Sequence, residues 1–183
     1  MKRAVIVHCW GGSSNYAWYP WVKLELEKLG YEVIVPDMPD SDQPKLATWL
    51  PHLQDVVGQP DDELVLIGHS IGTVTIMRYL ESLESGLVGK VILVAGFTDQ
   101  LGFKELENFF ETQLDFLKIK NKSKNGFVAI QSDDDPFVSE QYGKRLADEL
   151  GAILVVKHNA NHMSGEVDGE ESCSELPEVI ESL

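Results

Sequence analysis

Apolar residues along the chain gather in six short runs, which are separated by longer stretches with a helical period. Within each run the apolar residues stand at consecutive positions, a pattern typical of strands that are buried on both faces of a parallel sheet. Val and Ile are frequent in these runs, which cover residues 4–9, 32–35, 64–68, 90–95, 126–131 and 152–157. The pattern therefore predicts six parallel strands.

The stretches between the runs predict helices over residues 18–29, 43–57, 70–83 and 139–150. Gly30 and Gly151 directly follow two of them, at the position where glycine most often ends a helix. Because strands and helices alternate, we expect right-handed crossovers that place helices on both faces of a mainly parallel sheet. No linker or repeat interrupts the alternation, which predicts a single α/β domain over residues 1–183.

The chain is strongly acidic. Its 183 residues include 15 Lys and Arg against 30 Asp and Glu, which gives a formal net charge of −15. Such a charge repels phosphate backbones and anionic bilayers, and no apolar run approaches the length that crosses a membrane. Nucleic acid and membrane partners are therefore not expected. A chain of this length buries roughly 70% of its unfolded surface, enough for a core without disulfides or a structural metal.

Two cysteines, Cys9 and Cys173, lack the spacing of a disulfide framework or a zinc site. The N-terminus begins like a signal peptide, but its apolar run ends at His8, too early for secretion. These features predict a cytoplasmic protein without metal or cofactor. Residues 166–178 carry six acidic side chains, which predicts a solvated loop before a short C-terminal helix. An interaction tail for a protein partner is the second interpretation of this acidic segment.

The strongest chemical signal is the segment Gly68-His69-Ser70-Ile71-Gly72, a G-x-S-x-G pattern between a predicted strand and a predicted helix. In this context the pattern is typical of a nucleophile elbow, a sharp turn that presents the serine hydroxyl above the carboxyl end of the sheet. Gly68 and Gly72 let the flanking segments pass close together. Ser70 is therefore the predicted nucleophile.

A serine nucleophile needs a base, and the base needs an acid that orients it. His158 and His162 follow the last predicted strand, and His162 is favoured because it lies in a polar loop that can reach back over the sheet. The acid is expected among the three aspartates at 133–135. Asp135 is favoured over Asp133 and Asp134, since the proline after it keeps it extended.

Two backbone amides are expected to bind the oxyanion, those of Ile71 and of Trp10 in the loop after the first strand. Cys9, beside Trp10, is a rival nucleophile, but a thiol at the end of a buried strand is usually an inert apolar filler. Residues 96–125 are too few for a large cap domain. The site should then be open and suited to short or medium acyl groups, with an apolar pocket formed by Trp10, Tyr16, Trp18, Phe97 and Phe103.

Several short segments spread over the chain match one known family. They are Trp18-Tyr19-Pro20-Trp21, Met38-Pro39, Gln43-Pro44, Trp49-Leu50, the Gly68 to Gly72 elbow, Asp135-Pro136-Phe137-Val138 and Asn161-His162. On these segments the whole chain resembles the compact α/β-hydrolase family of retinoblastoma-binding protein nine and the YdeN-like serine hydrolases. The resemblance implies catalytic Ser70, Asp135 and His162, and six strands in the order 2-1-3-4-5-6.

The sequence departs from this family's pattern at two positions. His8-Cys9 stands where many α/β-hydrolases have His-Gly after the first strand, which leaves the choice of oxyanion amide open. Asn161 precedes the predicted base where glycine is usual. A loop position that favours glycine is therefore expected to be strained or reshaped here.

Two hypotheses from different classes follow. The first is a metal-independent serine hydrolase of small esters, thioesters or amides, which acts through a Ser-His-Asp triad and an acyl-enzyme and has a small-molecule acyl substrate as its partner. The alternative is a binding or scaffold protein on the same fold with little turnover, suggested by the aromatic residues 18–21 and the acidic residues 166–178. Nucleotide or flavin binding is disfavoured, because no glycine-rich phosphate-binding pattern is present.

Overall fold

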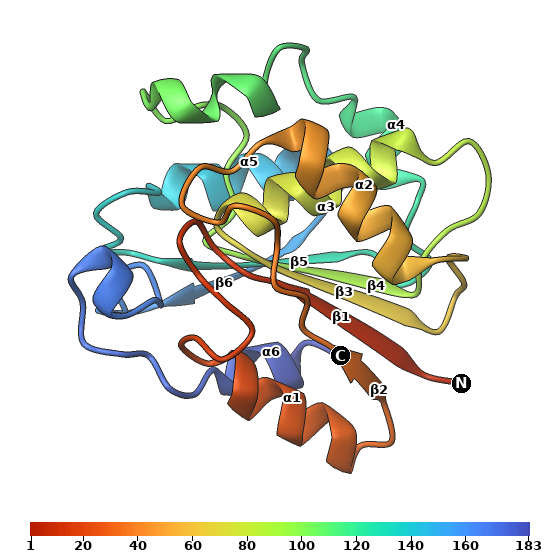
Figure 1. Cartoon of the computed structure of the whole chain (residues 1–183), viewed down its shortest axis with the longest axis horizontal. Coiled ribbons are helices and arrows are strands. Elements are labelled where there is room, and N and C mark those ends of the chain that lie inside the picture. Colours follow the sequence, from red (N-terminus) through yellow and green to blue (C-terminus); the bar gives the residue numbers. More distant parts are fainter.

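A computed structural model describes all residues, 1–183, and contains a six-stranded sheet (Figure 1). The strands are β1 (Arg3–Val7), β2 (Glu32–Ile34), β3 (Leu64–His69), β4 (Lys90–Val94), β5 (Phe127–Ser132) and β6 (Ile153–Lys157). They lie in the order β2-β1-β3-β4-β5-β6, and every neighbouring pair is parallel. The predicted parallel sheet and its order are confirmed.

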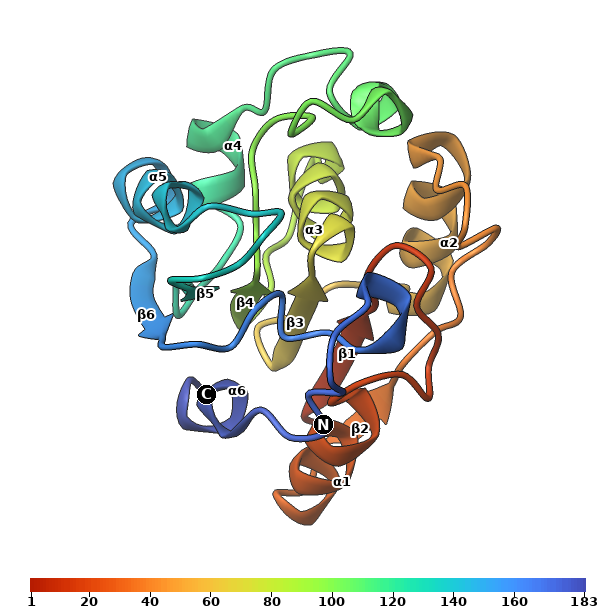
Figure 2. The same ribbon diagram turned by 90° about the vertical axis from the view of Figure 1, so that its left-hand side faces the viewer.

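Helices cover both faces of the sheet, as predicted (Figures 1 and 2). The α-helices are α1 (Tyr19–Lys28), α2 (Leu46–Val57), α3 (Ile71–Ser82), α4 (Phe116–Lys120), α5 (Glu140–Leu150) and α6 (Pro177–Glu181). In both views α1 and α6 lie on one side, and the other four lie on the opposite side. Helix α2 begins three residues later than residue 43, because Lys45 is still extended. None of these helices has the length and apolar character that a bilayer crossing requires.

Each central strand supplies side chains to two separate cores, which explains its consecutive apolar residues. In β1, Val5 and Val7 pack in the core under α2, α3 and α5, whereas Ala4 and Ile6 pack in the core over α1 and α6. Successive side chains of a strand point to opposite faces, so a strand covered on both sides must be apolar throughout. The consecutive apolar residues of each predicted strand therefore follow from packing on both faces of the sheet.

The connection between β4 and β5 adds no cap domain, in agreement with the prediction. It contains a short 3-10 helix, η1 (Lys104–Phe109), followed by α4. Phe97 and Phe109 are buried in the core beneath this connection, whereas Phe103 is 41% exposed. The end of the sheet consequently stays open on this side.

The functional candidates lie in four loops that follow parallel strands and therefore meet at one edge of the sheet. The first loop (residues 8–18) follows β1, the elbow follows β3, the acid loop (residues 133–138) follows β5, and the base loop (residues 158–165) follows β6. In Figure 2 the chain after β6 runs back across the sheet to the end of β1. The base loop thus reaches over the sheet as expected.

Strand β1 and helix α3 approach so closely at Gly72 that a side chain there has no space. A Cβ on Gly72 would lie 2.3 Å from the carbonyl oxygen of Val7. We therefore expect Gly72→Ala to lower the free energy of unfolding by about 2–4 kcal/mol, because the backbone of β1 must move. Urea denaturation measures this loss.

Gly30→Ala is the matched control for this prediction. Gly30 has a φ of +85°, but a Cβ there would meet no atom within 4 Å. Only the left-handed backbone opposes the methyl group, so the expected cost is about 1 kcal/mol. Equal losses in the two variants would contradict the steric explanation at Gly72.

Candidate active site

Ser70 stands on a sharp turn between β3 and α3, with φ 54° and ψ −121°. A residue other than glycine in this region costs about 1–3 kcal/mol, so the surroundings must enforce the turn. A Cβ on Gly68 would lie 2.8 Å from the backbone of Thr73, which shows how closely strand and helix pass. The Ser70 amide also donates to the carbonyl of Val94 at 2.9 Å. The local geometry is that of the predicted nucleophile elbow.

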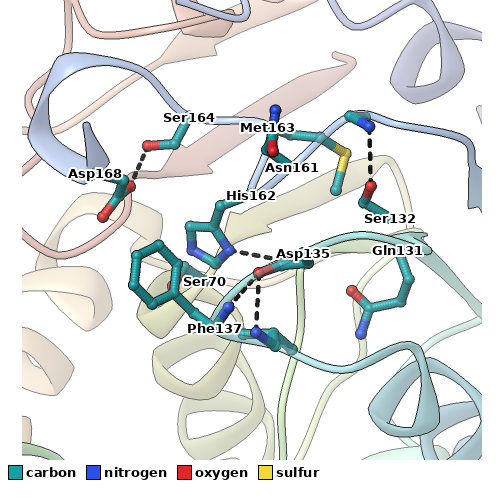
Figure 3. A network of polar contacts seen from close by, with 12 residues as sticks. Ser70, Gln131, Ser132, Asp135, Phe137, Asn161, His162, Met163, Ser164 and Asp168 are labelled. Atoms are coloured by element: carbon teal, nitrogen blue, oxygen red, sulfur yellow. Dashed lines mark hydrogen bonds and ion pairs between the residues drawn. The ribbon is translucent and has the colours of Figure 1, made fainter. Parts of the chain in front are cut away.

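His162 and Asp135 form a buried pair beside Ser70 (Figure 3). The distance from His162 Nδ1 to Asp135 Oδ2 is 2.8 Å, and the two side chains are only 4% and 0% exposed. The other carboxylate oxygen, Oδ1, accepts from the amides of Phe137 and Val138 at 2.8 and 2.9 Å. An ionised carboxylate only accepts, so the ring proton lies on Nδ1 and Nε2 is free to accept a proton.

The other two aspartates of the acid loop hold the base loop instead. Asp133 pairs with exposed His158 at 2.5 Å and accepts from the amide of Asn159. Asp134 accepts from the hydroxyl of Ser132 and from the amide of Asn161. Each aspartate therefore has its own partner, and among the three only Asp135 contacts His162.

The backbone around His162 is held from three directions. His69 Nε2 donates to the carbonyl of His162 at 2.9 Å, and Trp18 Nε1 donates to the carbonyl of Met163 at 3.0 Å. On the other side, the carboxylate of Glu170 accepts from the His162 amide at 2.8 Å. This carboxylate is itself partly buried, and burial raises its pKa. Asn161, which replaces the usual glycine, adopts φ 48°, a left-handed conformation that asparagine tolerates.

A chain of hydrogen bonds connects the first loop to the base loop. The amide of Cys9 donates to the hydroxyl of Tyr19 at 3.0 Å, and this hydroxyl lies 2.7 Å from Nδ1 of His69. Burial lowers the pKa of His69 to about 3, so its imidazole is neutral and carries one ring proton. Since Nε2 uses this proton to donate to the His162 carbonyl, Nδ1 accepts from Tyr19.

The buried His69 predicts a specific loss of stability in acid. Between about pH 6.5 and pH 3 the unfolded chain binds a proton at this imidazole and the folded chain does not, so stability falls as the pH falls. The expected slope is about 1.4 kcal/mol per pH unit. Chemical denaturation of the wild type and His69→Gln at several pH values should show this slope in the wild type and a shallower one in the variant.

His158→Gln is the control for this pH dependence. Asp133 raises the pKa of the exposed His158, so protonation there favours the folded state. Because this proton is bound in both the folded and the unfolded state below about pH 6.5, removing the His158 imidazole should leave the acid slope nearly unchanged, unlike removal of His69. Identical pH profiles for the wild type and His69→Gln would contradict the prediction.

Ser70 and His162 share the wall of one apolar cavity of about 230 Å³. The cavity is lined by Cys9, Trp10, Ser70, Ile71, Phe97, Leu101, Phe103, Leu106, Phe137, Val138, His162, Val167 and Asp168. Asp135 lies behind His162 and does not line it. Ser70 and His162 are not hydrogen-bonded to each other, a looseness that is frequent in catalytic sites before substrate binds.

Both predicted oxyanion donors lie at this cavity. Trp10 and Ile71 line it together with Ser70. In the first loop the amides of Cys9, Gly11 and Gly12 already donate to other groups, to Tyr19, Ser41 and Cys9 respectively. The amide of Trp10 has no partner within the chain. The hydrogen bonding of the loop therefore leaves the backbone amide of Trp10 free to bind an anion.

Two expected pocket residues, Tyr16 and Trp18, do not line the cavity. Trp18 is fully buried, and it packs on His69 with ring centroids 5.6 Å apart. The hydroxyl of Tyr16 lies 3.0 Å from Ser164 Oγ, behind the cavity wall. Their hydrogen-bonding groups hold the base loop, so the prediction that these two side chains help to form the pocket is wrong. Trp10, Phe97 and Phe103 do line the cavity.

Several cavity residues were not among those expected from the sequence. Phe137 and Val138 directly follow the acid and its proline. They belong to the segment Asp135-Pro136-Phe137-Val138, whose resemblance to the family could have marked them as pocket residues. Val167 and Asp168 belong to the acidic segment, in the short helix η2 (Glu166–Asp168), and no sequence pattern pointed to them. Cys9 also lines the cavity, but burial raises the pKa of its thiol to about 11, which opposes a role as nucleophile.

Comparison with known proteins agrees with this geometry. The family model described as serine hydrolase matches residues 4–182. The chain belongs to the serine hydrolase family. YdeN of Bacillus subtilis is 32% identical over 185 residues, which cover 100% of this chain and 94% of YdeN. The serine hydrolase RBBP9 of Rattus norvegicus is 32% identical over 157 residues, covering 83% of this chain and 82% of RBBP9.

A crystal structure gives the same fold. The structure of the ydeN gene product of B. subtilis superposes with a TM-score of 0.90 at 31% identity, covering 99% of this chain and 96% of that chain. The six parallel strands in the order 2-1-3-4-5-6, with helices on both faces and no large cap, form a minimal α/β-hydrolase fold. Membership of this family establishes the protein as a hydrolase.

Proposed function

We propose that the protein cleaves small esters, thioesters or amides through a triad of Ser70, His162 and Asp135 and a covalent acyl-enzyme. The observation that carries the proposal is the buried Asp135–His162 pair, whose imidazole shares the cavity wall with Ser70 on its strained elbow. This pair leaves the unprotonated Nε2 of His162 on the side away from Asp135.

In the first half of the reaction, Ser70 Oγ attacks the carbonyl carbon of the substrate and Nε2 of His162 takes the hydroxyl proton. The resulting imidazolium is stabilised by the carboxylate of Asp135. The bond to the leaving group then breaks, and Nε2 donates its proton to the departing oxygen, sulfur or nitrogen. The acyl group remains as an ester on Ser70.

Water completes the cycle. It attacks the acyl carbon while His162 accepts one of its protons, and the bond to Ser70 Oγ breaks as that proton passes to Oγ. In both halves the amides of Trp10 and Ile71 bind the oxyanion of the tetrahedral intermediate. Loss of one such donor typically costs about 10²–10³ in rate. Apart from this water molecule and the substrate, the proposed reaction uses only groups of the chain.

The size and lining of the cavity favour short or medium acyl groups. A volume of about 230 Å³ lined mainly by apolar side chains accommodates a few carbons and buries them from water. Phe103 and Phe137 at its rim are both partly exposed, so the cavity opens to solvent there. We propose that such esters are better substrates than long-chain esters.

A fluorophosphonate probe tests the proposed chemistry directly. The activated serine should attack the phosphorus and displace fluoride, leaving a stable phosphonyl group on Ser70 Oγ. Digestion and mass spectrometry should find the modification on the peptide that contains Ser70. The exposed Ser13 in the first loop is the internal control, because none of the histidine side chains forms a hydrogen bond with it. An unlabelled protein, or a label on Ser13, would contradict the proposal.

A further inference from the structure

The cavity beside Ser70 has an unusual balance of charge. Neither Lys nor Arg lines it, and Asp168 is the one carboxylate in its wall. Four aromatic side chains, those of Trp10, Phe97, Phe103 and Phe137, make up much of the remaining lining. A group of atoms that enters this cavity therefore meets ring faces, aliphatic carbons and a single negative charge.

Asp168 is oriented by a chain of hydroxyl groups. Ser164 Oγ donates to Asp168 Oδ2 (Figure 3), and the hydroxyl of Tyr16 lies 3.0 Å from the same Ser164 oxygen. Because the Ser164 proton is given to Asp168, Tyr16 must donate to Ser164. The Tyr16 hydroxyl in turn accepts from the amide of Val167 at 3.2 Å. These bonds hold Asp168 at the cavity by one oxygen only.

The second oxygen of Asp168, Oδ1, is left without a partner. It accepts no hydrogen bond from the chain, and no Lys, Arg or His forms an ion pair with this carboxylate. Of the other titratable groups in the cavity wall, Cys9 carries no positive charge and His162 already turns its Nδ1 to Asp135. The charge of Asp168 is thus uncompensated within the protein.

We propose that Asp168 is a specificity-determining residue that selects substrates carrying a positively charged group, such as an amine or a quaternary ammonium. This inference rests on the proposed acyl transfer at Ser70 and names the substrate class for it. The positive group lies against the carboxylate and the aromatic rings while the reacting carbonyl lies at Ser70. Anionic substrates are disfavoured, since no cationic side chain lines the cavity.

Two physical effects act in the same direction here. A cation is attracted by the negative face of an aromatic ring, and it is also attracted by an unpaired carboxylate in a partly dehydrated cavity. Neither effect acts on a neutral group of the same shape. The two together should favour the cation by about fivefold in kcat/KM, given the usual strength of such contacts at partly exposed sites.

Pairs of thioesters that differ only in charge test the inference. In one pair, S-butyryl thiocholine is compared with S-(3,3-dimethylbutyl) thiobutyrate, so that trimethylammonium and tert-butyl groups are exchanged in the leaving group. In a second pair, the same exchange is made at the end of the acyl chain of an S-ethyl thioester. Release of thiol gives kcat/KM for each compound at low ionic strength, where surface screening is weak.

The wild type should prefer the cation about fivefold in at least one pair, and Asp168→Asn should reduce the ratio to about two, the part that the aromatic rings supply. The ratio within one variant is unaffected by a general loss of activity. Glu166→Gln removes the same charge from an exposed side chain that does not line the cavity, and it should keep the preference. Absence of a preference in both pairs, or its equal loss in Glu166→Gln, would overturn the inference.

Two further measurements keep the result interpretable. If Asp168→Asn fails to fold, Phe103→Leu takes its place, because it removes one aromatic face and should lower the cation preference about twofold. An undiminished preference in Phe103→Leu then counts against the inference. Turnover of the neutral thioesters without cation preference refutes this inference alone, whereas no turnover and no fluorophosphonate label refute the proposed function as well.

Discussion

Ser70→Ala is expected to lower kcat/KM for a short-chain ester by about 10⁶-fold, to the residual rate that substrate binding and the oxyanion amides sustain alone. The alanine has no nucleophile, and the buried His162–Asp135 pair alone forms no acyl-enzyme. Steady-state assays with a chromogenic butyrate ester measure the loss. A triad acts as a unit, so adding a second substitution at His162 should cost little more.

The control for this experiment separates chemistry from folding. Ser13→Ala, in the first loop, removes an exposed hydroxyl outside the cavity and should keep full activity. Thermal denaturation of Ser70→Ala should resemble that of the wild type, because the Ser70 side chain makes no hydrogen bond within the fold. Residual turnover within about tenfold of the wild type would mean that another group is the nucleophile.

Asp135→Asn should lower kcat by about 10⁴-fold while the fold is retained. The structure gives a specific reason. Two amides, those of Phe137 and Val138, bind one oxygen of Asp135, and they will hold the amide oxygen of asparagine in the same place. The NH₂ group then faces Nδ1 of His162, so Nδ1 must accept and the ring proton moves to Nε2. An imidazole protonated there cannot take the proton of Ser70.

Asp134→Asn is the matched comparison for this result. Asp134 accepts from Ser132 and Asn161 and does not contact the imidazole of His162. Its replacement should loosen the base loop and lower stability slightly, with a small effect on kcat. The assignment of the triad acid fails if Asp134→Asn is the slower enzyme of the two.

The features that the sequence predicted well are those with a local physical cause. Strands buried on both faces require consecutive apolar residues, and the elbow requires glycine at positions 68 and 72 because backbone atoms lie where side chains would stand. The choice of Asp135 followed from the proline after it, and the structure places this carboxylate against His162. Each of these inferences depends on a few neighbouring residues.

The features that were missed depend on contacts between distant parts of the chain. Trp18 and Tyr16 were expected in the pocket because their loop follows β1, but their polar atoms bond Met163 and Ser164, about 145 residues later. Asp168 looked like one of several solvated acidic residues, yet the path of the chain after β6 brings it to the cavity. Such placements follow from tertiary packing, which a linear pattern does not record.

The structure also weakens the scaffold alternative. That hypothesis used residues 18–21 as an aromatic surface, but Trp18 and Tyr19 are fully buried. It also used the acidic residues 166–178 as an interaction tail, whereas Asp168 and Glu170 contact the base loop. Burial of Trp18 and Tyr19 removes part of the aromatic reason, whereas the exposed Glu166, Glu171 and Glu175 keep the acidic interaction tail as a prediction.

The hydrogen-bond chain from Cys9 through Tyr19 and His69 to His162 has a consequence for how this enzyme can diversify. It ties the first loop and the base loop into one rigid support, so substitutions along it will disturb both oxyanion binding and proton transfer. The wall of the cavity that the half-exposed Phe103 forms with its neighbours Leu101 and Leu106 is bound by no such chain. New substrate preferences can therefore arise by mutation on that wall while the reacting groups keep their positions.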